Sequence, residues 1–230
     1  SPQSRDAFEG VQVAVQERAL GTGDAVRSAR EAVGSGAESL LVLSGDTPLL
    51  TTELLRELVE THRRKQAAAT VLSFVPDDPR SYGRVVRGPG DTVVAIVEAA
   101  DATPAQLDVA ECNSSIYVFR TELLWPALER LEPHNAQGEL YLTDAVRDLV
   151  EGGERVVAHV AADAAETEGV NTRVELATAA ATLRDRIKAT VRAAAAHRTE
   201  PTGRRRHRAH LRRRRRVRHR ATLRPAVQNA

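Results

Sequence analysis

Short apolar runs of strand length alternate with amphipathic segments of helical length through most of the 230 residues. The clearest helical segment, 52–65, places Leu54, Leu55 and Leu58 on one face. Strands that alternate with helices are joined by crossover connections, so the pattern predicts an α/β fold with a doubly wound, mainly parallel sheet. Two strand-like runs separated by Gly88-Pro89-Gly90 predict an antiparallel insertion around 80–120.

The remaining elements follow from the same periodicities. The expected strands are residues 11–15, 39–43, 69–74, 83–86, 92–98, 115–119 and 156–160. The expected helices are 25–33, 52–65, 121–131, 142–151 and 172–190. Because the run 39–43 is apolar at nearly every position, we expect a strand buried on both faces.

Composition and charge limit the class of protein. The single Cys112 excludes an internal disulfide framework, and no apolar run reaches the roughly 18–20 residues that span a bilayer. A cytoplasmic protein without membrane association is therefore expected. Because the chain contains no methionine, Ser1 is not expected to be the natural start.

The formal net charge of +2 hides two opposed parts. Residues 1–197 hold 20 Lys+Arg against 30 Asp+Glu, whereas 198–230 hold 13 Arg against one Glu. The like-charged block is expected to be disordered and to bind nucleic acid only non-specifically, as a polyanion. One interpretation is a nucleic-acid-binding arm, although no aromatic residue is interleaved to stack on bases. The interpretation that we favour is a misread frame in a GC-rich gene.

Asp46 is the strongest single candidate for a functional residue. It follows the apolar run 39–43 in the sequence Ser44-Gly45-Asp46-Thr47-Pro48, and ligands of open α/β sheets bind outside the carboxyl ends of such strands. Mg2+ prefers oxygen donors and commonly takes one or two carboxylates, with phosphates and water completing the shell. The alternative is that Asp46 caps the helix that begins near Thr51.

Other candidates have the same placement at turns and strand ends. Gly21-Thr22-Gly23 forms a tight turn that allows a ligand to approach the backbone, and the Gln16 amide offers a donor and an acceptor to a pyrimidine edge. The remaining candidates are strand-end or pre-helix residues that could contact a sugar or a metal: Gly83, Glu98, Asn113 and Asn171. Each has an ordinary alternative, namely a turn glycine, a solvated acid, a turn residue or a helix cap.

These motifs, taken in order, resemble those of the sugar-nucleotide pyrophosphorylases. The segments that carry the resemblance are Gln16…Gly21-Thr22-Gly23, Ser44–Leu49, Tyr82-Gly83-Arg84, Ile96-Val97-Glu98, Asn113–Tyr117, Asn135–Asp144 and Gly169–Arg173. The likeness is greatest to the uridylyltransferase domain of the bifunctional N-acetylglucosamine-1-phosphate uridylyltransferase / glucosamine-1-phosphate acetyltransferase family. It covers about residues 10–188 and implies a Rossmann-like nucleotidyltransferase sheet.

The resemblance implies a Mg2+-dependent enzyme that transfers UMP from UTP to N-acetyl-glucosamine 1-phosphate. The products would be UDP-N-acetylglucosamine, a precursor of bacterial peptidoglycan and lipopolysaccharide, and pyrophosphate. It also implies site roles: uracil binding by Gln16, Gly21 and Thr22; a nucleotide cleft lined by Ser44 and Gly45; metal binding by Asp46 and Asn171; and contacts to the sugar by Gly83, Glu98 and Asn113. No side chain is expected to act as a general acid, general base or nucleophile.

Some family features are not found in this sequence. The glycine-rich phosphate loop that begins the family domain does not occur, so residues 1–188 are interpreted as a uridylyltransferase domain without its first strand and with impaired activity. Residues 189–230 are interpreted as a linker and Arg-rich tail, and no hexapeptide repeat of the acetyltransferase domain follows. The family homotrimer is therefore not expected. Smaller departures are Asp24, Ser44 and Ser115, where the family usually has histidine, an aromatic residue and glycine.

Two other functions stay open at the level of sequence. One is a related sugar-1-phosphate nucleotidylyltransferase that uses another sugar or nucleotide. The other is a non-enzymatic nucleic-acid-binding protein that acts through the basic tail.

Overall fold

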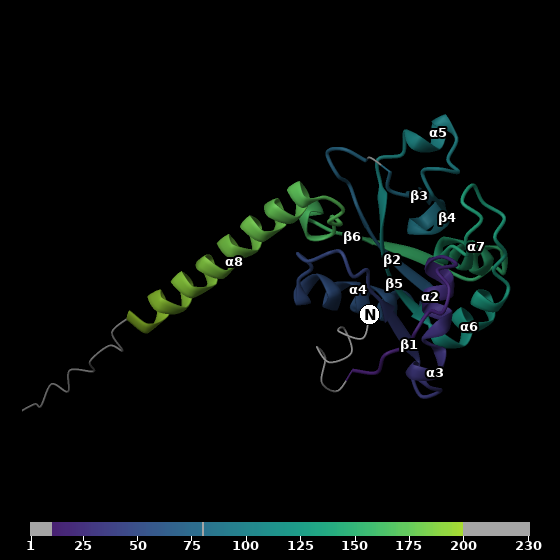
Figure 1. Cartoon of the computed structure of the whole chain (residues 1–230), viewed down its shortest axis with the longest axis horizontal. Coiled ribbons are helices and arrows are strands. Elements are labelled where there is room, and N and C mark those ends of the chain that lie inside the picture. The colour runs from purple at the N-terminus through teal and green to yellow at the C-terminus, as the bar shows by residue number, and fades with distance from the viewer. Residues whose placement is uncertain (1–10, 80, 200–230) are drawn as a thin grey trace, which may run out of the picture. The chain divides into compact units, whose positions relative to one another are not determined.

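A computed structural model describes residues 11–79 and 81–199. Six strands form one sheet in the order β4-β3-β5-β2-β6, and β1 pairs with β5 outside this path (Figure 1). The strands are β1 (Ser39–Val42), β2 (Ala69–Phe74), β3 (Arg84–Arg87), β4 (Val93–Val97), β5 (Cys112–Arg120) and β6 (Val156–Val160). The α-helices are α2 (Thr22–Ser28), α3 (Arg30–Val33), α4 (Thr52–Lys65), α5 (Pro104–Leu107), α6 (Thr121–Glu129), α7 (Leu142–Glu151) and α8 (Arg173–Thr199). Two 3-10 turns, Pro89–Asp91 and Ala164–Glu166, complete the list.

The predicted α/β class is confirmed, and the sheet is mixed. β2 and β6 are parallel neighbours, whereas β5 is antiparallel to β1, β2 and β3. The predicted hairpin-like insertion is confirmed, because β3 and β4 pair antiparallel. The sheet was expected to be mainly parallel. Four strands, β1, β2, β3 and β6, do run in the same direction. However, the antiparallel strand β5 lies between β2 on one side and β1 and β3 on the other, so most neighbouring pairs are antiparallel. Sequence periodicity could not place β5 there, because it does not report the order of strands.

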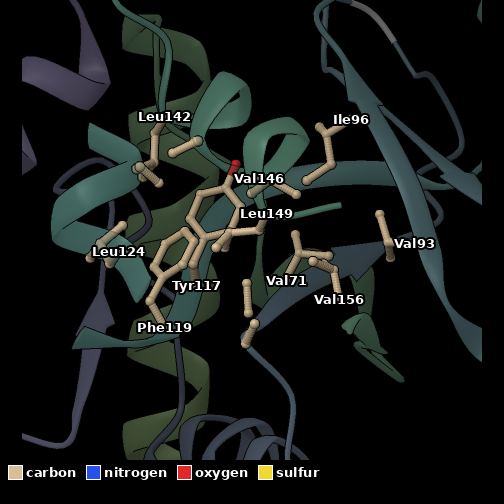
Figure 2. Close-up of a cluster of buried hydrophobic side chains, with 14 of the residues drawn as sticks. Val71, Val93, Ile96, Tyr117, Phe119, Leu124, Leu142, Val146, Leu149 and Val156 are labelled. Carbon is tan, nitrogen blue, oxygen red and sulfur yellow. The ribbon is translucent and has the colours of Figure 1, made fainter. Parts of the chain in front are cut away.

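Side chains of the central strands alternate between two hydrophobic clusters, one on each face of the sheet. In β5, Tyr117 and Phe119 enter the cluster formed with α6 and α7, while Ile116 and Val118 enter the cluster formed with α4. Figure 2 shows the first cluster, with Tyr117 and Phe119 beside residues of α6 and α7. Burial on both faces explains the continuous apolar runs of β2 and β5, and it fixes their register.

Local capping explains where several helices begin. The Thr51 hydroxyl accepts a hydrogen bond from the Leu54 N–H at 3.2 Å and so caps α4. A second cap involves α8, where the Glu175 N–H donates to Thr172 Oγ1 and the Glu175 carboxylate accepts from the Thr172 N–H. The two alternative cap assignments are therefore wrong: neither Asp46 nor the side chain of Asn171 caps the following helix.

One prediction for the N-terminal region is wrong, and a second is met in part. Residues 11–15 are not a strand, and Val11, Val13 and Val15 are 48–58 % exposed. Alternating apolar residues do not form a strand without hydrogen bonds to a neighbouring strand, and among the described residues no strand pairs with this run. The run 39–43 forms β1 only to Val42, and Leu43 is 47 % exposed. Its burial on both faces is partial: Leu40 and Val42 pack against the cluster formed with α6 and α7, and Leu41 packs against the cluster formed with α4.

The helices agree with the predictions for α4 and α7 and differ elsewhere. The helix predicted at 25–33 begins three residues earlier and divides at Ala29 into α2 and α3. The short α5 was not expected, although Thr103 and Gln106 form a capping box for it. No helix in the described ranges is both long and apolar enough to cross a bilayer. The Arg-rich block lies outside the described residues, and contacts divide the chain into two units, Ser1–Arg186 and Ile187–Ala230.

Candidate functional site

A pocket of about 520 Å3 opens at the carboxyl end of β1. It lies between α2, the start of α7 and the segments that follow β1 and β4. Its lining residues are Thr22, Ala25, Val26, Val42, Leu43, Ser44, Gly45, Ser81, Glu98, Ala99, Ala100, Ser115, Tyr117, Gln137, Glu139, Tyr141, Leu142 and Thr143. Four residues predicted from sequence, Thr22, Ser44, Gly45 and Glu98, therefore line one cavity. The other six predicted residues do not line it, and the contacts described below connect them to one another and to its lining residues.

The loop before α2 is fixed by close contact with the segment before α7. Gly21 has φ of 119°, and a Cβ at this position would lie 2.6 Å from the Leu140 carbonyl oxygen. The Leu140 N–H donates to the Leu20 carbonyl at 2.7 Å, and the Thr22 hydroxyl accepts from the Leu142 N–H at 3.0 Å. Only glycine fits at 21. Thr22, from α2, thereby satisfies the first N–H of α7 and ties the two helices together at the pocket.

The Gln16 amide lies beside this loop. Its Nε2 donates to the Gly21 carbonyl at 3.2 Å and to Asp24 Oδ2 at 2.8 Å. Arg27 holds the other carboxylate oxygen of Asp24 at 2.6 Å. These hydrogen bonds, the Gln16 bond first, lower the pKa of Asp24 despite its burial.

Asp46 and Asn171 come together from distant parts of the chain. The Val170 N–H donates to the Asp46 carbonyl at 2.8 Å, and Ser44 Oγ donates to Asp46 Oδ1 at 2.5 Å. A Cβ placed on Gly169 would meet Asp46 Oδ2 at 3.4 Å and Asn171 Nδ2 at 3.7 Å. The Asp46 carboxylate and the Asn171 carboxamide therefore both lie beside Gly169, the carboxamide with its nitrogen toward that residue. A carboxylate and the oxygen of a carboxamide are donors that Mg2+ prefers, so the chemistry of this pair fits the metal.

No larger cluster of metal ligands competes with this pair. In 11–79 and 81–199, no group of three or more His, Cys, Asp or Glu side chains stands together. A site with one carboxylate and one carboxamide suits a cation whose remaining ligands are substrate phosphates and water.

Gly83, Glu98 and Asn113 form the third part of the site. The Asn113 N–H donates to the Gly83 carbonyl at 2.8 Å, and a Cβ on Gly83 would meet Glu98 Oε2 at 3.2 Å. The three residues predicted to contact a sugar are thus brought together by β3, β4 and β5. Gly83 leaves the space that the Glu98 carboxylate occupies.

Burial and neighbouring groups define the chemistry of this part. Burial raises the pKa of Glu98, which accepts a hydrogen bond from Thr143 Oγ1 at 3.1 Å. Tyr117 is 1 % exposed, and its hydroxyl accepts from Asn113 Nδ2 at 2.8 Å; burial raises its pKa, so it stays neutral. Glu98 therefore lines the pocket as an acceptor, whereas the buried Asn113 side chain is held by Tyr117 and the Ser115 N–H.

Thr143 and Tyr117 were missed in the sequence analysis. Tyr117 lies in the Asn113–Tyr117 segment that carries the family resemblance, but a strand pattern does not show that its hydroxyl meets Asn113. Thr143 lies in the Asn135–Asp144 block that carried the family resemblance, and this block was the available signal. Ser115 was noted only as a departure, and the structure gives it φ of 61°, in the region that favours glycine.

Comparison with known proteins identifies the class. A family model described as nucleotidyl transferase matches residues 3–201, and the chain belongs to this family of nucleotidyl-transferring enzymes. Among curated relatives, the chain is 47 % identical over 176 residues to the bifunctional protein GlmU of Exiguobacterium sp., covering 76 % of this chain and 39 % of that protein. It is 44 % identical over 180 residues to the bifunctional protein GlmU of Mycobacterium marinum, covering 78 % and 37 %. The chain thus spans about two fifths of the length of these relatives.

Proposed function

We propose that this chain binds UTP and N-acetyl-glucosamine 1-phosphate and transfers UMP to the sugar phosphate, giving UDP-N-acetylglucosamine and pyrophosphate for bacterial cell-wall precursors. The observation that carries the proposal is the lining of one pocket by Thr22, Ser44 and Glu98. These residues belong to three separate motifs to which the resemblance assigns the uracil, the nucleotide cleft and the sugar. The likeness to the GlmU proteins supports the same choice of substrates.

In this proposal each part of the site has a separate task. Gln16 and the loop at Gly21 bind the uracil, and Glu98 accepts hydrogen bonds from sugar hydroxyls beside Asn113. Asp46 and Asn171 hold Mg2+, which supplies charge neutralisation and orientation of the phosphates when bound. The raised pKa of Glu98 does not prevent its role, because either protonation state retains an acceptor oxygen.

The transfer itself needs no general base. A phosphate oxygen of the sugar phosphate, already ionised, attacks the α-phosphorus of UTP in line, and the bond from that phosphorus to the β-phosphate oxygen breaks. Pyrophosphate leaves with the electron pair of the broken bond. Positioning and charge neutralisation then account for catalysis.

Pyrophosphate release tests this proposal. The full chain is mixed with MgCl2, UTP and N-acetyl-glucosamine 1-phosphate, and glucose 1-phosphate or CTP replaces one substrate in parallel reactions. We expect release above background only with the first pair, and its loss in Glu98→Ala. A matched control is Glu122→Gln, which changes an exposed acid outside the pocket. Release with another sugar phosphate or nucleotide would instead favour a related nucleotidylyltransferase, and would contradict the substrates proposed here.

A further inference from the structure

The orientation of the Gln16 carboxamide is determined by its neighbours. Its nitrogen lies 2.8 Å from Asp24 Oδ2 and 3.2 Å from the Gly21 carbonyl oxygen. A carbonyl is only an acceptor, and so is an ionised carboxylate, so both neighbours require the NH2 group of Gln16 at this place. Turning the amide by 180° would put its oxygen against two acceptors. The NH2 group is therefore fixed toward Asp24 and Gly21, and Oε1 is directed away from these two acceptors.

Asp24 is the stronger of these two acceptors and is itself held in place. It lies in the first turn of α2 and is 7 % exposed. Its second oxygen receives Arg27 Nη2 at 2.6 Å, one turn further along the helix. The carboxylate is thus ionised, largely shielded from water, and held by one charge-assisted hydrogen bond to each of its oxygens, and such hydrogen bonds are the stronger kind. A rigid acceptor of this sort keeps the amide from exchanging its two ends.

The outward oxygen of Gln16 is left for a ligand. Within 11–79 and 81–199, no donor is hydrogen-bonded to Gln16 Oε1. An acceptor at this position suits a base edge that presents N–H. Uracil carries a proton on N3, whereas N3 of cytosine carries a lone pair, which an amide oxygen repels.

We propose that Asp24 determines the choice of nucleobase: by fixing the Gln16 carboxamide with its oxygen outward, it selects a base with an imide N–H, uracil, against cytosine. This inference rests on the proposed function, since it takes a pyrimidine nucleotide as the ligand beside Gln16. It adds to that function a positioning residue that touches no substrate. Asp24 acts only through the orientation of Gln16.

Exchange of the carboxylate for a carboxamide tests the proposal. In Asp24→Asn the new NH2 group can donate to Gln16 Oε1, so the turned orientation of the Gln16 amide gains a hydrogen bond and is opposed only by the Gly21 carbonyl. We expect the ratio of UTP to CTP affinity, measured by titration calorimetry of the full chain with MgCl2, to fall at least about tenfold. A mismatched hydrogen bond of roughly 1.4 kcal/mol corresponds to this factor.

Two further variants separate positioning from folding. Asp24→Ala removes the acceptor without adding a donor, and we expect a smaller fall in the ratio, because the Gly21 carbonyl still holds the amide. Arg27→Gln removes the ion pair but leaves the Gln16–Asp24 hydrogen bond, and we expect the ratio to stay within about twofold of the wild type. Thermal unfolding of each variant checks that it is folded.

The outcomes distinguish this inference from the proposed function. Suppose that the wild type binds UTP, and that Asp24→Asn keeps the preference for UTP over CTP or binds both nucleotides more weakly by the same factor. Asp24 is then only structural, and the inference is overturned. If the folded wild type binds neither nucleotide, the proposed function fails and the inference fails with it. A changed ratio in Asp24→Asn together with an unchanged ratio in Arg27→Gln supports both.

Discussion

Replacing Tyr117 by phenylalanine removes one hydroxyl that joins the core to the sugar side of the pocket. The Tyr117 ring is buried among apolar side chains, and its hydroxyl accepts from Asn113 Nδ2 at 2.8 Å. Asn113 is 3 % exposed. The substitution keeps the ring packing and leaves a buried amide without this partner, which costs about 1–3 kcal/mol. Phenylalanine has no hydroxyl to desolvate, so we expect the free energy of unfolding to fall by an amount in the lower half of this range, about 1–2 kcal/mol.

Urea unfolding followed by the fluorescence of Trp125, the single tryptophan, measures this loss. The slope with denaturant should not change, because the surface exposed on unfolding is nearly the same. The melting temperature should fall by roughly 2–8 °C, at about 2–4 °C for each kcal/mol in a chain of this size. We also expect weaker binding of UDP-N-acetylglucosamine, because the Asn113 side chain would keep, among the described residues, only its hydrogen bond from the Ser115 N–H.

A double-mutant cycle with Asn113→Ala isolates the interaction from the other effects of each change. A coupling free energy of about 1 kcal/mol or more is expected. A loss below about 0.3 kcal/mol in Tyr117→Phe, with unchanged affinity for the sugar nucleotide, would refute the reasoning, because the hydroxyl would then contribute neither to stability nor to the site.

Three further predictions concern a carboxyl and two backbone positions. Because burial raises the pKa of Glu98, the folded protein binds more protons than the unfolded chain as pH rises above 4.5, and its stability falls through that range. Glu98→Gln should therefore raise the melting temperature at pH 7 but not near pH 4. Equal shifts of the melting temperature at both pH values would contradict this. Gly21→Ala should lower the free energy of unfolding by about 2–4 kcal/mol, since its Cβ would lie 2.6 Å from a backbone oxygen, whereas Gly36→Ala, with nothing within 4 Å, should change it little. Ser115→Gly should raise it by up to about 1 kcal/mol, because Ser115 has φ of 61°; a loss in denaturant titration would show that the serine side chain contributes more than the strain removes.

Local patterns were enough to predict most elements, because the segments carry their own signals. α4 has an amphipathic face and a threonine cap, and β2 has an apolar run of strand length, so both were predicted with the observed bounds. The strand predicted at residues 11–15 does not form, because a strand depends on a partner outside its own segment. Their alternation is as regular as that of a strand, but a strand needs a neighbour to accept its hydrogen bonds, and one sequence does not show which neighbour is present.

The candidate site shows the same division between local and distant information. Asp46 was expected from its place after β1, and its closeness to Asn171 needs the chain to return near Gly169 after more than a hundred residues. The spacing of the motifs could not show that Asp46 and Asn171 lie close together. The family resemblance paired them, because it assigns both residues to one metal. The partners of Gln16, Asn113 and Glu98 depend on side-chain directions, which no periodicity reports. The orientation of the Gln16 amide by Asp24 could therefore be inferred only from the structure.

Isothermal titration of the full chain with UDP-N-acetylglucosamine tests the central claim most directly. The titration is made with MgCl2 and with EDTA, for the wild type and for Asp46→Ala, with thermal unfolding as the control for folding. We predict binding that depends on Mg2+ and that Asp46→Ala weakens at least about tenfold, because one of the two metal ligands is lost. Equal affinity in MgCl2 and EDTA, or no binding by the folded wild type, would contradict a metal-dependent nucleotide-sugar site at Asp46 and Asn171.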